Sequence, residues 1–192
     1  MNHKRPPIRP GRLITRIAAG TVAFLACLQS LSAAPLFNTP VYNPHTKSYF
    51  LLVKVKPDEF DPGSEGNRWR FAEEYAEHHV FKGVRGRLAV IKDLETTAWV
   101  ETTFRPGAEA WIGLRYVCNE RQLEWTDGTY FRPGDFQLWT KYWYQSEERP
   151  CGIPNEQMPV EIYVDMDGVH WAARGYDKAF ELYFMEYPTG QP

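Results

Sequence analysis

The run AWIGL at residues 110–114 is uncharged and largely apolar, and it follows the turn residues Pro106-Gly107. A short apolar run bounded by turn residues is typical of a strand buried in a sheet. We therefore predict a buried β-strand here. The elements on either side of it follow from the periodicity of apolar residues and from the positions of glycine and proline.

A strand and then a helix are predicted upstream of this run. Residues 49–55 are aromatic and β-branched, which is typical of a strand. From Trp69 onward, apolar residues recur at steps of three and four, which predicts an amphipathic helix running to about Val80. Gly83 and Gly86 are expected to end it.

A short strand and a second helix are predicted next. Residues 88–91 form a short apolar run that favours a strand. Asp93 can accept a hydrogen bond from the first turn of a helix, so we expect it to cap one. One face of this helix is expected to carry Leu94, Ala98, Trp99 and Thr102.

Downstream of the central run, the pattern predicts short strands and turns as far as Thr140. Residues 144–159 are polar, contain three prolines and have no period, so we expect a long loop. A half-buried, alternating strand at 160–164, a hairpin turn at Asp167-Gly168 and a final strand at 180–187 follow. This order, with helices separate from most strands, predicts an α+β fold with a mainly antiparallel sheet.

The composition indicates one packed domain, because 43% of the 192 residues are hydrophobic and 15% are aromatic. The first 34 residues contain five basic and no acidic residues. The remainder has 17 Lys and Arg against 24 Asp and Glu, a net charge of −7. An acidic body has no electrostatic reason to seek phosphate backbones, so we expect no nucleic-acid partner.

Residues 1–34 have the organisation of a secretory signal peptide. A basic segment precedes twelve uncharged residues at 17–28, and small residues follow, with cleavage expected near Ala33 or Ala34. Twelve helical residues span about 18 Å, which is short of the ~30 Å hydrocarbon core. We expect a secreted, periplasmic or extracellular product with no stable membrane span after cleavage. A membrane anchor and lipidation of Cys27 are the alternatives.

Two cysteines, Cys118 and Cys151, remain after the predicted cleavage. An even pair in an exported protein predicts a disulfide, which would stabilise the fold by roughly 3–4 kcal/mol. Two free buried thiols are the alternative. Neither cysteine has neighbouring histidines at the spacing of a zinc site.

Several motifs occur in the order in which the C-type lectin-like domain has them. WIGL at 111–114 matches the family's motif of the same letters, and WTDG at 125–128 is like its W-x-D-G turn. GIPN at 152–155 stands where the family has Gly-Glu-Pro-Asn, and YFMEYP at 183–188 is similar to its closing segment. Taken together, the chain resembles a divergent, secreted, bacterial-type member of this family.

The resemblance implies an α+β fold in which the first and last strands pair, two helices flank antiparallel sheets and a long loop emerges. It implies a domain at 48–188 that follows a lead-in segment at 35–47. Family members usually join the first helix to the last strand by a disulfide. Ala76 and Met185 occupy those positions here, and we expect apolar packing between these elements instead.

The resemblance also raises the question of calcium, which many family members hold through E-P-N, a loop Glu and W-N-D. Ile153 replaces the Glu of E-P-N, and Trp171-Ala172-Ala173 replaces W-N-D. Because Ca²⁺ needs six to eight oxygen ligands, we expect no calcium and no other metal cofactor. Four glutamates remain in this part of the chain: Glu147, Glu148, Glu156 and Glu161. We interpret them as an acidic rim exposed to solvent, and a displaced metal site is the alternative.

The predicted function is non-enzymatic recognition of a glycan or protein ligand by the long loop, without calcium. Trp143, Asn155 and Glu156 are the candidate ligand-binding residues, since an exposed ring can stack on a sugar or anchor a partner. At least one tryptophan of the aromatic group at 139–144 is expected in the core. No nucleophile with a base and an orienting group stands out, which argues against an enzyme. A calcium-dependent lectin and a structural surface protein are the alternatives.

Overall fold

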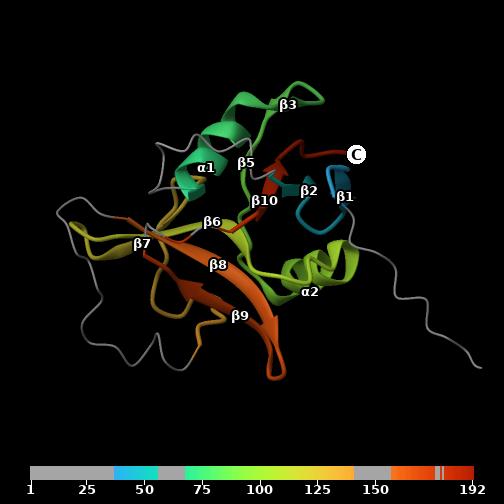
Figure 1. Cartoon of the computed structure of the whole chain (residues 1–192). Helices are drawn as coiled ribbons and strands as arrows, with labels where there is room; N and C mark the ends of the chain where they lie inside the picture. The colour runs from blue at the N-terminus through green and yellow to red at the C-terminus, as the bar shows by residue number, and fades with distance from the viewer. Residues whose placement is uncertain (1–36, 56–67, 141–156, 176–177, 179) are drawn as a thin grey trace, which may run out of the picture. The chain divides into compact units, whose positions relative to one another are not determined.

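The computed structural model describes residues 37–55, 68–140, 157–175, 178 and 180–192, all within the unit formed by Ala33–Pro192 (Figure 1). The predicted signal peptide at 1–34 lies outside these residues, and so does most of the predicted long loop. Both stay predictions, as do the domain boundaries. No helix in the described part of the chain has the length and hydropathy needed to cross a bilayer.

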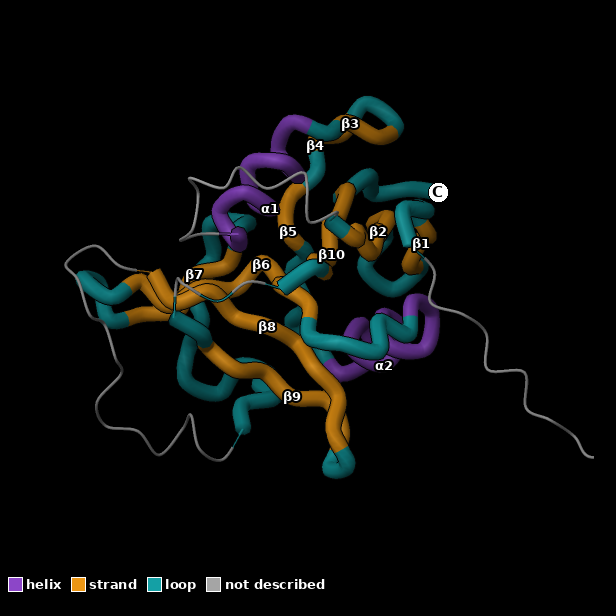
Figure 2. The backbone as a smooth tube through the Cα atoms, viewed as in Figure 1, coloured by secondary structure: helices purple, strands orange, loops and turns teal. Residues whose placement is uncertain are grey.

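The described strands form one large sheet and one small hairpin (Figure 2). The strands of the large sheet are β1 (Val41–Asn43), β2 (Ser48–Lys54), β5 (Arg87–Leu88), β6 (Ala110–Val117), β7 (Gln122–Trp125), β8 (Gln157–Asp165), β9 (Gly168–Ala173) and β10 (Leu182–Tyr187). Their order is β1-β2-β10-β6-β8-β9, with β5 beside β10 and β7 beside β6. Only β10 and β6 are parallel among these described neighbours. The hairpin pairs β3 (Val80–Phe81) with β4 (Val84–Arg85).

The first and last long strands pair with each other, as predicted. β2 and β10 are antiparallel, from Lys54 opposite Leu182 to Tyr49 opposite Tyr187. Their buried side chains divide between two apolar clusters. We call these the main cluster, which contains Phe104 and Trp171, and the second cluster, which contains Trp69 and Trp111. Both faces of the β2–β10 pair are therefore buried.

Each of the two helices contributes to a different cluster. α1 (Arg68–His78) buries Trp69 and Ala76 in the second cluster, and α2 (Leu94–Phe104) buries Phe104 in the main cluster. Figure 1 shows the two helices on different sides of β10. The predicted α+β fold with two flanking helices is confirmed.

Apolar packing joins the first helix to the last strand, as expected where the family usually has a disulfide. Ala76 and Met185 are fully buried members of the second cluster. Gly86 lies between them: a Cβ atom on this residue would meet the Ala76 carbonyl oxygen at 2.8 Å and Met185 Cε at 3.1 Å. Close packing around a glycine thus connects α1 and β10.

Two details of the helices differ from the prediction. Asp93 caps α2 as expected, because its Oδ1 accepts a hydrogen bond from Thr96 N at 2.7 Å. The buried face was predicted wrongly, since Leu94 is 65% exposed. The buried residues are Thr96, Thr97, Val100 and Phe104. α1 ends at His78 instead of Val80, which begins the β3–β4 hairpin.

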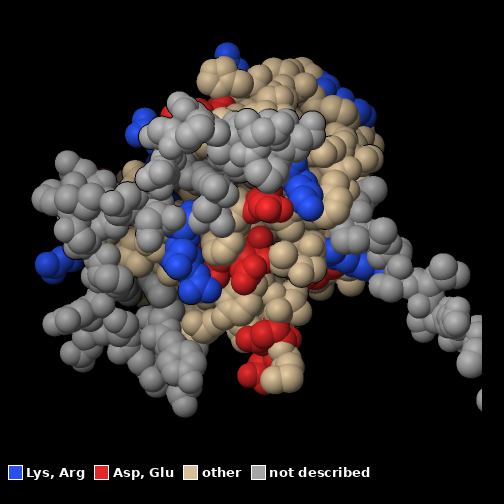
Figure 3. Space-filling view, viewed as in Figure 1, with Lys and Arg blue, Asp and Glu red and all other residues tan. Residues whose placement is uncertain are grey.

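β8 differs from the predicted half-buried strand. It begins at Gln157, and all residues from Met158 to Ile162 are buried, so residues on both faces of the strand are covered. The turn to β9 is present, but Asp165 pairs with Gly168, which leaves Met166-Asp167 as the two-residue loop. Acidic side chains gather at this tip (Figure 3).

Candidate functional site

The candidate ligand-binding residues Trp143, Asn155 and Glu156 fall in the segment 141–156, outside the described residues, so their roles stay predictions. Cys151 falls in the same segment. Its predicted partner, Cys118, is half-buried at the end of β6 and packs against the main cluster. The disulfide also stays a prediction. The described residues on either side of the segment are those at 138–140 and the start of β8.

Residues 138–140 are held against β9. Trp171 N donates a hydrogen bond to the Leu138 carbonyl oxygen at 2.7 Å, and Thr140 N donates to the Trp171 carbonyl oxygen at 3.2 Å. The rings of Trp139 and Trp171 meet edge to face, with centroids 5.6 Å apart. Trp139 is partly buried and packs against the main cluster, whereas the prediction was that at least one tryptophan of the 139–144 group belongs to the core.

The end of β9 provides no side-chain oxygens where the resemblance places Asn and Asp. Trp171, Ala172 and Ala173 are all buried, and the two alanines contribute only methyl groups. Within the described part of the chain, no group of three or more His, Cys, Asp and Glu side chains is placed to hold a metal ion.

A buried carboxylate lies opposite Ala172, across the β8–β9 ladder. The side chain of Glu161 is 0% exposed, and Arg174 forms an ion pair with it through both Nε and Nη2. The Nε hydrogen bond to Glu161 Oε1 is 2.6 Å long. Glu161 was predicted to belong to a solvated acidic rim, and that prediction is wrong, because the strand buries it.

The two oxygens of Glu161 have different surroundings. Oε1 accepts from Arg174, whereas Oε2 is buried without a hydrogen-bond partner among the described residues. Burial raises the pKa of Glu161, and the hydrogen bond and charge of Arg174 act in the opposite direction. The guanidinium thus offsets part of the cost of burying a carboxylate in this position.

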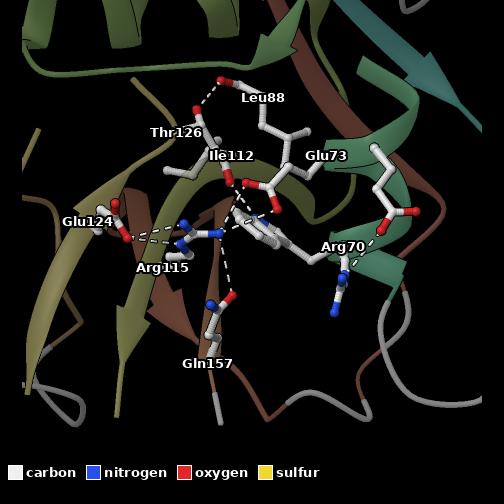
Figure 4. Close-up of polar contacts among 10 residues, drawn as sticks. Arg70, Glu73, Leu88, Ile112, Arg115, Glu124, Thr126 and Gln157 are labelled. Carbon is white, nitrogen blue, oxygen red and sulfur yellow. Dashed lines mark hydrogen bonds and ion pairs between the residues drawn. The ribbon is translucent and has the colours of Figure 1, made fainter. Parts of the chain in front are cut away.

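A second charged group lies at the start of β8 (Figure 4). Arg115 on β6 forms ion pairs with Glu73 of α1 and Glu124 of β7, both at 3.1 Å. It also donates to Gln157 Oε1 at 3.5 Å and lies over the Trp69 ring, 5.5 Å from the centroid. One guanidinium therefore joins α1, β7 and β8.

Burial also affects the carboxylates around Arg115. It raises the pKa of Glu73, although the charge of Arg115 lowers it. Arg115, Glu73 and Glu124 are only about one-fifth exposed, with side-chain exposures of 19%, 19% and 21%. Because each charge has an opposite partner, this group serves to position α1, β7 and β8.

A pocket of about 490 Å³ lies beside β7. Four aromatic side chains line it: Trp125, Tyr130, Phe131 and Phe136. Charged side chains also line it: Lys92, Arg132 and Asp135. Rings and charged groups thus meet in one concavity, which is the usual make-up of a small-ligand site.

The rim of the pocket is fixed by two polar networks. Lys92 Nζ donates to Asp127 Oδ2 and to Thr129 Oγ1, both at 2.6 Å. Burial raises the pKa of Asp127, but the hydrogen bonds from Lys92 and Thr129 outweigh it, so the pKa lies below its ordinary value. On the other side, Asp135 Oδ2 accepts from Arg132 N at 2.7 Å and closes a turn.

One carboxyl group outside these sites has a strongly shifted pKa. Burial raises the pKa of Glu101 on α2 from 4.5 to about 6. Its Oε1 is buried without a hydrogen-bond partner among the described residues. A buried carboxyl group without a hydrogen-bond partner makes the folded state less stable when the group is ionised.

We expect Glu101→Gln to stabilise the protein at neutral pH. The folded-state pKa of about 6 lies above the unfolded value, so the folded state binds the proton more tightly, and stability falls as the pH rises from 4.5 to 6. The amide of glutamine does not ionise, so it removes this loss of stability, which we put at about 1 kcal/mol after discounting for partial exposure.

Urea unfolding of both proteins at pH 7 and at pH 4 measures the difference in the free energy of unfolding. The gain should vanish at pH 4, and Glu95→Gln on the same helix should change stability by less than ~0.5 kcal/mol.

Sequence reasoning missed Arg115, Arg174 and the pocket beside β7. The W-x-D-G turn was identified, but the pairing of residues 129–131 back onto β7 was not. A signal was present in the aromatic pair Tyr130-Phe131 directly after the turn. No sequence signal marks Arg174 as the partner of Glu161, because cross-strand register decides that contact.

The family model for the lectin C-type domain matches residues 79–158. No curated protein has a detectable match to the chain. Among solved structures, the C-type lectin domain of murine dendritic cell inhibitory receptor 2, in complex with an N-glycan, has a TM-score of 0.52 and 19% identity over 76% of this chain and 94% of that one.

Two further structures have a comparable likeness. The cow C-type carbohydrate-recognition domain of CD23 has a TM-score of 0.51 and 17% identity, covering 80% of this chain and 96% of that one. A Ca²⁺-dependent type II antifreeze protein in its Ca²⁺-free form has a TM-score of 0.51 and 16% identity, covering 79% and 98%. At these identities the likeness shows the fold. The family match over residues 79–158 and the likeness to these solved domains together show that the chain is similar to C-type lectin domains and has their fold.

Proposed function

We propose that this domain is an exported, non-enzymatic recognition module that binds a glycan or protein ligand through the segment 141–156 without calcium. One observation carries the calcium-free part. On β9, where the resemblance places the Asn and Asp ligands, the described residues are Ala172 and Ala173, and Glu161 opposite Ala172 is already bonded to Arg174.

The chemistry of calcium supports this reading. The ion needs six to eight oxygen ligands at about 2.3–2.6 Å, with several from carboxylates. Ala172 and Ala173 offer none, and Arg174 brings its own positive charge to Glu161. A cation beside Glu161 would have to displace or face that guanidinium, which costs electrostatic energy.

Recognition without an ion would depend on rings, amides and carboxylates. Trp143 can stack on a sugar face or fill a hydrophobic pocket of a protein partner. Asn155 and Glu156 can supply hydrogen bonds that orient the ligand. The described base of this segment, with Trp139 packed on Trp171, is a rigid support for such contacts.

Calcium is expected to leave the melting temperature unchanged. A site with a dissociation constant near 1 mM, typical of weak extracellular sites, would stabilise the fold by about 1 kcal/mol at ~5 mM Ca²⁺. That corresponds to a rise of roughly 3 °C for a domain of this size. Thermal unfolding in ~5 mM CaCl₂ and in EDTA should therefore give the same midpoint within ~1 °C. A rise of several degrees would contradict the calcium-free proposal.

Binding itself is tested on a glycan array and with protein ligands, each in CaCl₂ and in EDTA. The proposal expects a signal that EDTA does not remove and that Trp143→Ala weakens. Trp143→Phe is the matched control, because it keeps an aromatic ring at the same position. A signal that disappears with EDTA would favour a calcium-dependent lectin instead.

A further inference from the structure

The pocket beside β7 has the size and the walls of a binding site, and nothing in the proposed function uses it. Its volume of about 490 Å³ lies within the range of roughly 300–1,000 Å³ that small-ligand sites occupy. Its described lining comes from β7, from the segment 128–136 and from Lys92. All of these residues precede the segment 141–156.

The aromatic wall offers a flat apolar surface that is only partly covered. Trp125 is 2% exposed, whereas Tyr130 is 48% exposed at the edge of the pocket. An exposed tyrosine ring in a concavity can pack against the C–H face of a sugar ring, because its π surface is apolar and carries partial negative charge. A purely polar ligand would leave this wall unused.

The polar groups of the pocket suit a ligand that carries hydroxyl groups and no charge. Arg132 offers N–H donors, and Asp135 Oδ1 and Oδ2 are acceptors. The charges of Lys92, Arg132, Asp127 and Asp135 cancel. A hydroxyl group both donates and accepts, so it can use both kinds of partner, whereas a phosphate or sulfate would face the carboxylates.

The pocket is largely pre-formed, which lowers the cost of binding. Trp125 and Phe136 each meet the buried Trp171 ring edge to face, with centroids 5.7 Å apart. The lining residues Arg132 and Asp135 belong to a turn that contains Gly134, with φ of 96°, and that is closed by the hydrogen bond from Asp135 N to the Arg132 carbonyl oxygen, 3.0 Å long. A positive φ in this range favours glycine, so the local sequence specifies the conformation of this turn.

From these contacts we infer that the pocket binds one uncharged sugar ring, which stacks on Tyr130 and forms hydrogen bonds with Arg132 and Asp135. The inference rests on the proposed function in one respect, namely that the domain recognises a glycan. It adds a second contact surface, separate from the one proposed for the segment 141–156.

Titration with methyl glycosides of glucose, galactose, mannose and N-acetylglucosamine tests this inference. Binding is followed by NMR through the backbone amides of Gly128 and Thr129, which line the pocket. At least one glycoside should shift these signals. Tyr130→Ala should weaken its binding about tenfold, the value of one aromatic contact, whereas Tyr130→Phe should stay within about twofold. Tyr75→Ala is the matched control, since Tyr75 is 37% exposed on α1, outside the pocket.

The possible results separate the pocket from the proposed function. If no glycoside shifts these amides, or if Tyr130→Ala binds as well as the unaltered protein, the pocket inference is wrong. The same holds if methyl glucuronide, a charged probe, binds more than tenfold more tightly than every neutral glycoside. Array binding that Trp143→Ala weakens and Tyr130→Ala leaves unchanged would retain the proposed function alone. Array binding that Tyr130→Ala weakens and Trp143→Ala leaves unchanged would support the pocket inference and contradict the proposed role of the segment 141–156.

Discussion

Gly113→Ala is expected to lower the free energy of unfolding by about 4 kcal/mol. A Cβ atom at this position would lie 2.5 Å from the Leu88 carbonyl oxygen and 2.9 Å from the Ala89 carbonyl oxygen, and it would overlap Thr126 Oγ1. Two of these three obstacles are backbone atoms, which cannot rotate away as a side chain can. Urea unfolding monitored by tryptophan fluorescence measures the loss.

The backbone around Gly113 has little freedom to relieve the overlap. Gly113 N donates to the Ala89 carbonyl oxygen at 2.8 Å, and Thr126 N donates to the Gly113 carbonyl oxygen at 2.7 Å. A shift of β6 away from Leu88 would weaken both bonds, each of which contributes about 1 kcal/mol. The close approach of three chain segments therefore requires glycine in the WIGL motif.

Gly128→Ala is the matched control, because it separates steric overlap from backbone conformation. Gly128 has φ of 79°, and a Cβ atom there would meet nothing within 4 Å. Alanine at this position costs only the strain of a left-handed conformation, about 1 kcal/mol. An equal loss for the two variants would mean that overlap at Gly113 is not what makes glycine necessary.

The strands and the fold class could be predicted from local patterns in the sequence. The apolar run at 110–114 lies in β6, and the hydrophobic and aromatic residues at 49–55 lie almost entirely in β2. Both patterns are local, so they can be recognised without knowing which strands become neighbours. The cap at Asp93 was also local, since it needs only a short polar side chain before a helix.

The buried face of α2 could not be predicted in the same way. The apolar residues of the helix suggested one face, but Thr96 and Thr97 are buried instead. Their hydroxyl groups donate to Asp93 Oδ2 and to the Asp93 carbonyl oxygen, both at 2.9 Å. A polar side chain that is satisfied within its own turn can be buried at little cost, and hydrophobicity alone gives no sign of this.

The polar groups near the candidate site depended on register between distant strands. Arg115 and Glu73 are far apart in sequence, and their contact needs α1 to lie across β6. The burial of Glu161 on β8 depends on Arg174, which comes directly after the neighbouring strand β9 and forms the ion pair with it. Neither pairing follows from the period of a single segment, because a shift of one residue would move every side chain of a strand to the other face.

Arg174→Met is expected to lower the free energy of unfolding by about 2 kcal/mol at pH 7. The change leaves Glu161, whose side chain is 0% exposed, as a buried charge with no partner for Oε1. Breaking a fully buried pair typically costs about 3–5 kcal/mol, and the value here is smaller because Arg174 is 39% exposed. Methionine keeps an unbranched apolar chain over Glu161, so the loss reports the charge and not the packing.

The pH dependence and two further variants show whether the buried charge is responsible. Burial already raises the pKa of Glu161, and loss of Arg174 should raise it further, so the folded variant binds a proton that the unfolded chain releases. The loss in stability should therefore shrink as the pH falls toward ~4. Glu161→Gln combined with Arg174→Met should recover most of it. Arg70→Met, which removes an exposed pair with Glu74, should cost only about 0.3 kcal/mol. If Arg174→Met costs no more than Arg70→Met, then the guanidinium does not neutralise Glu161.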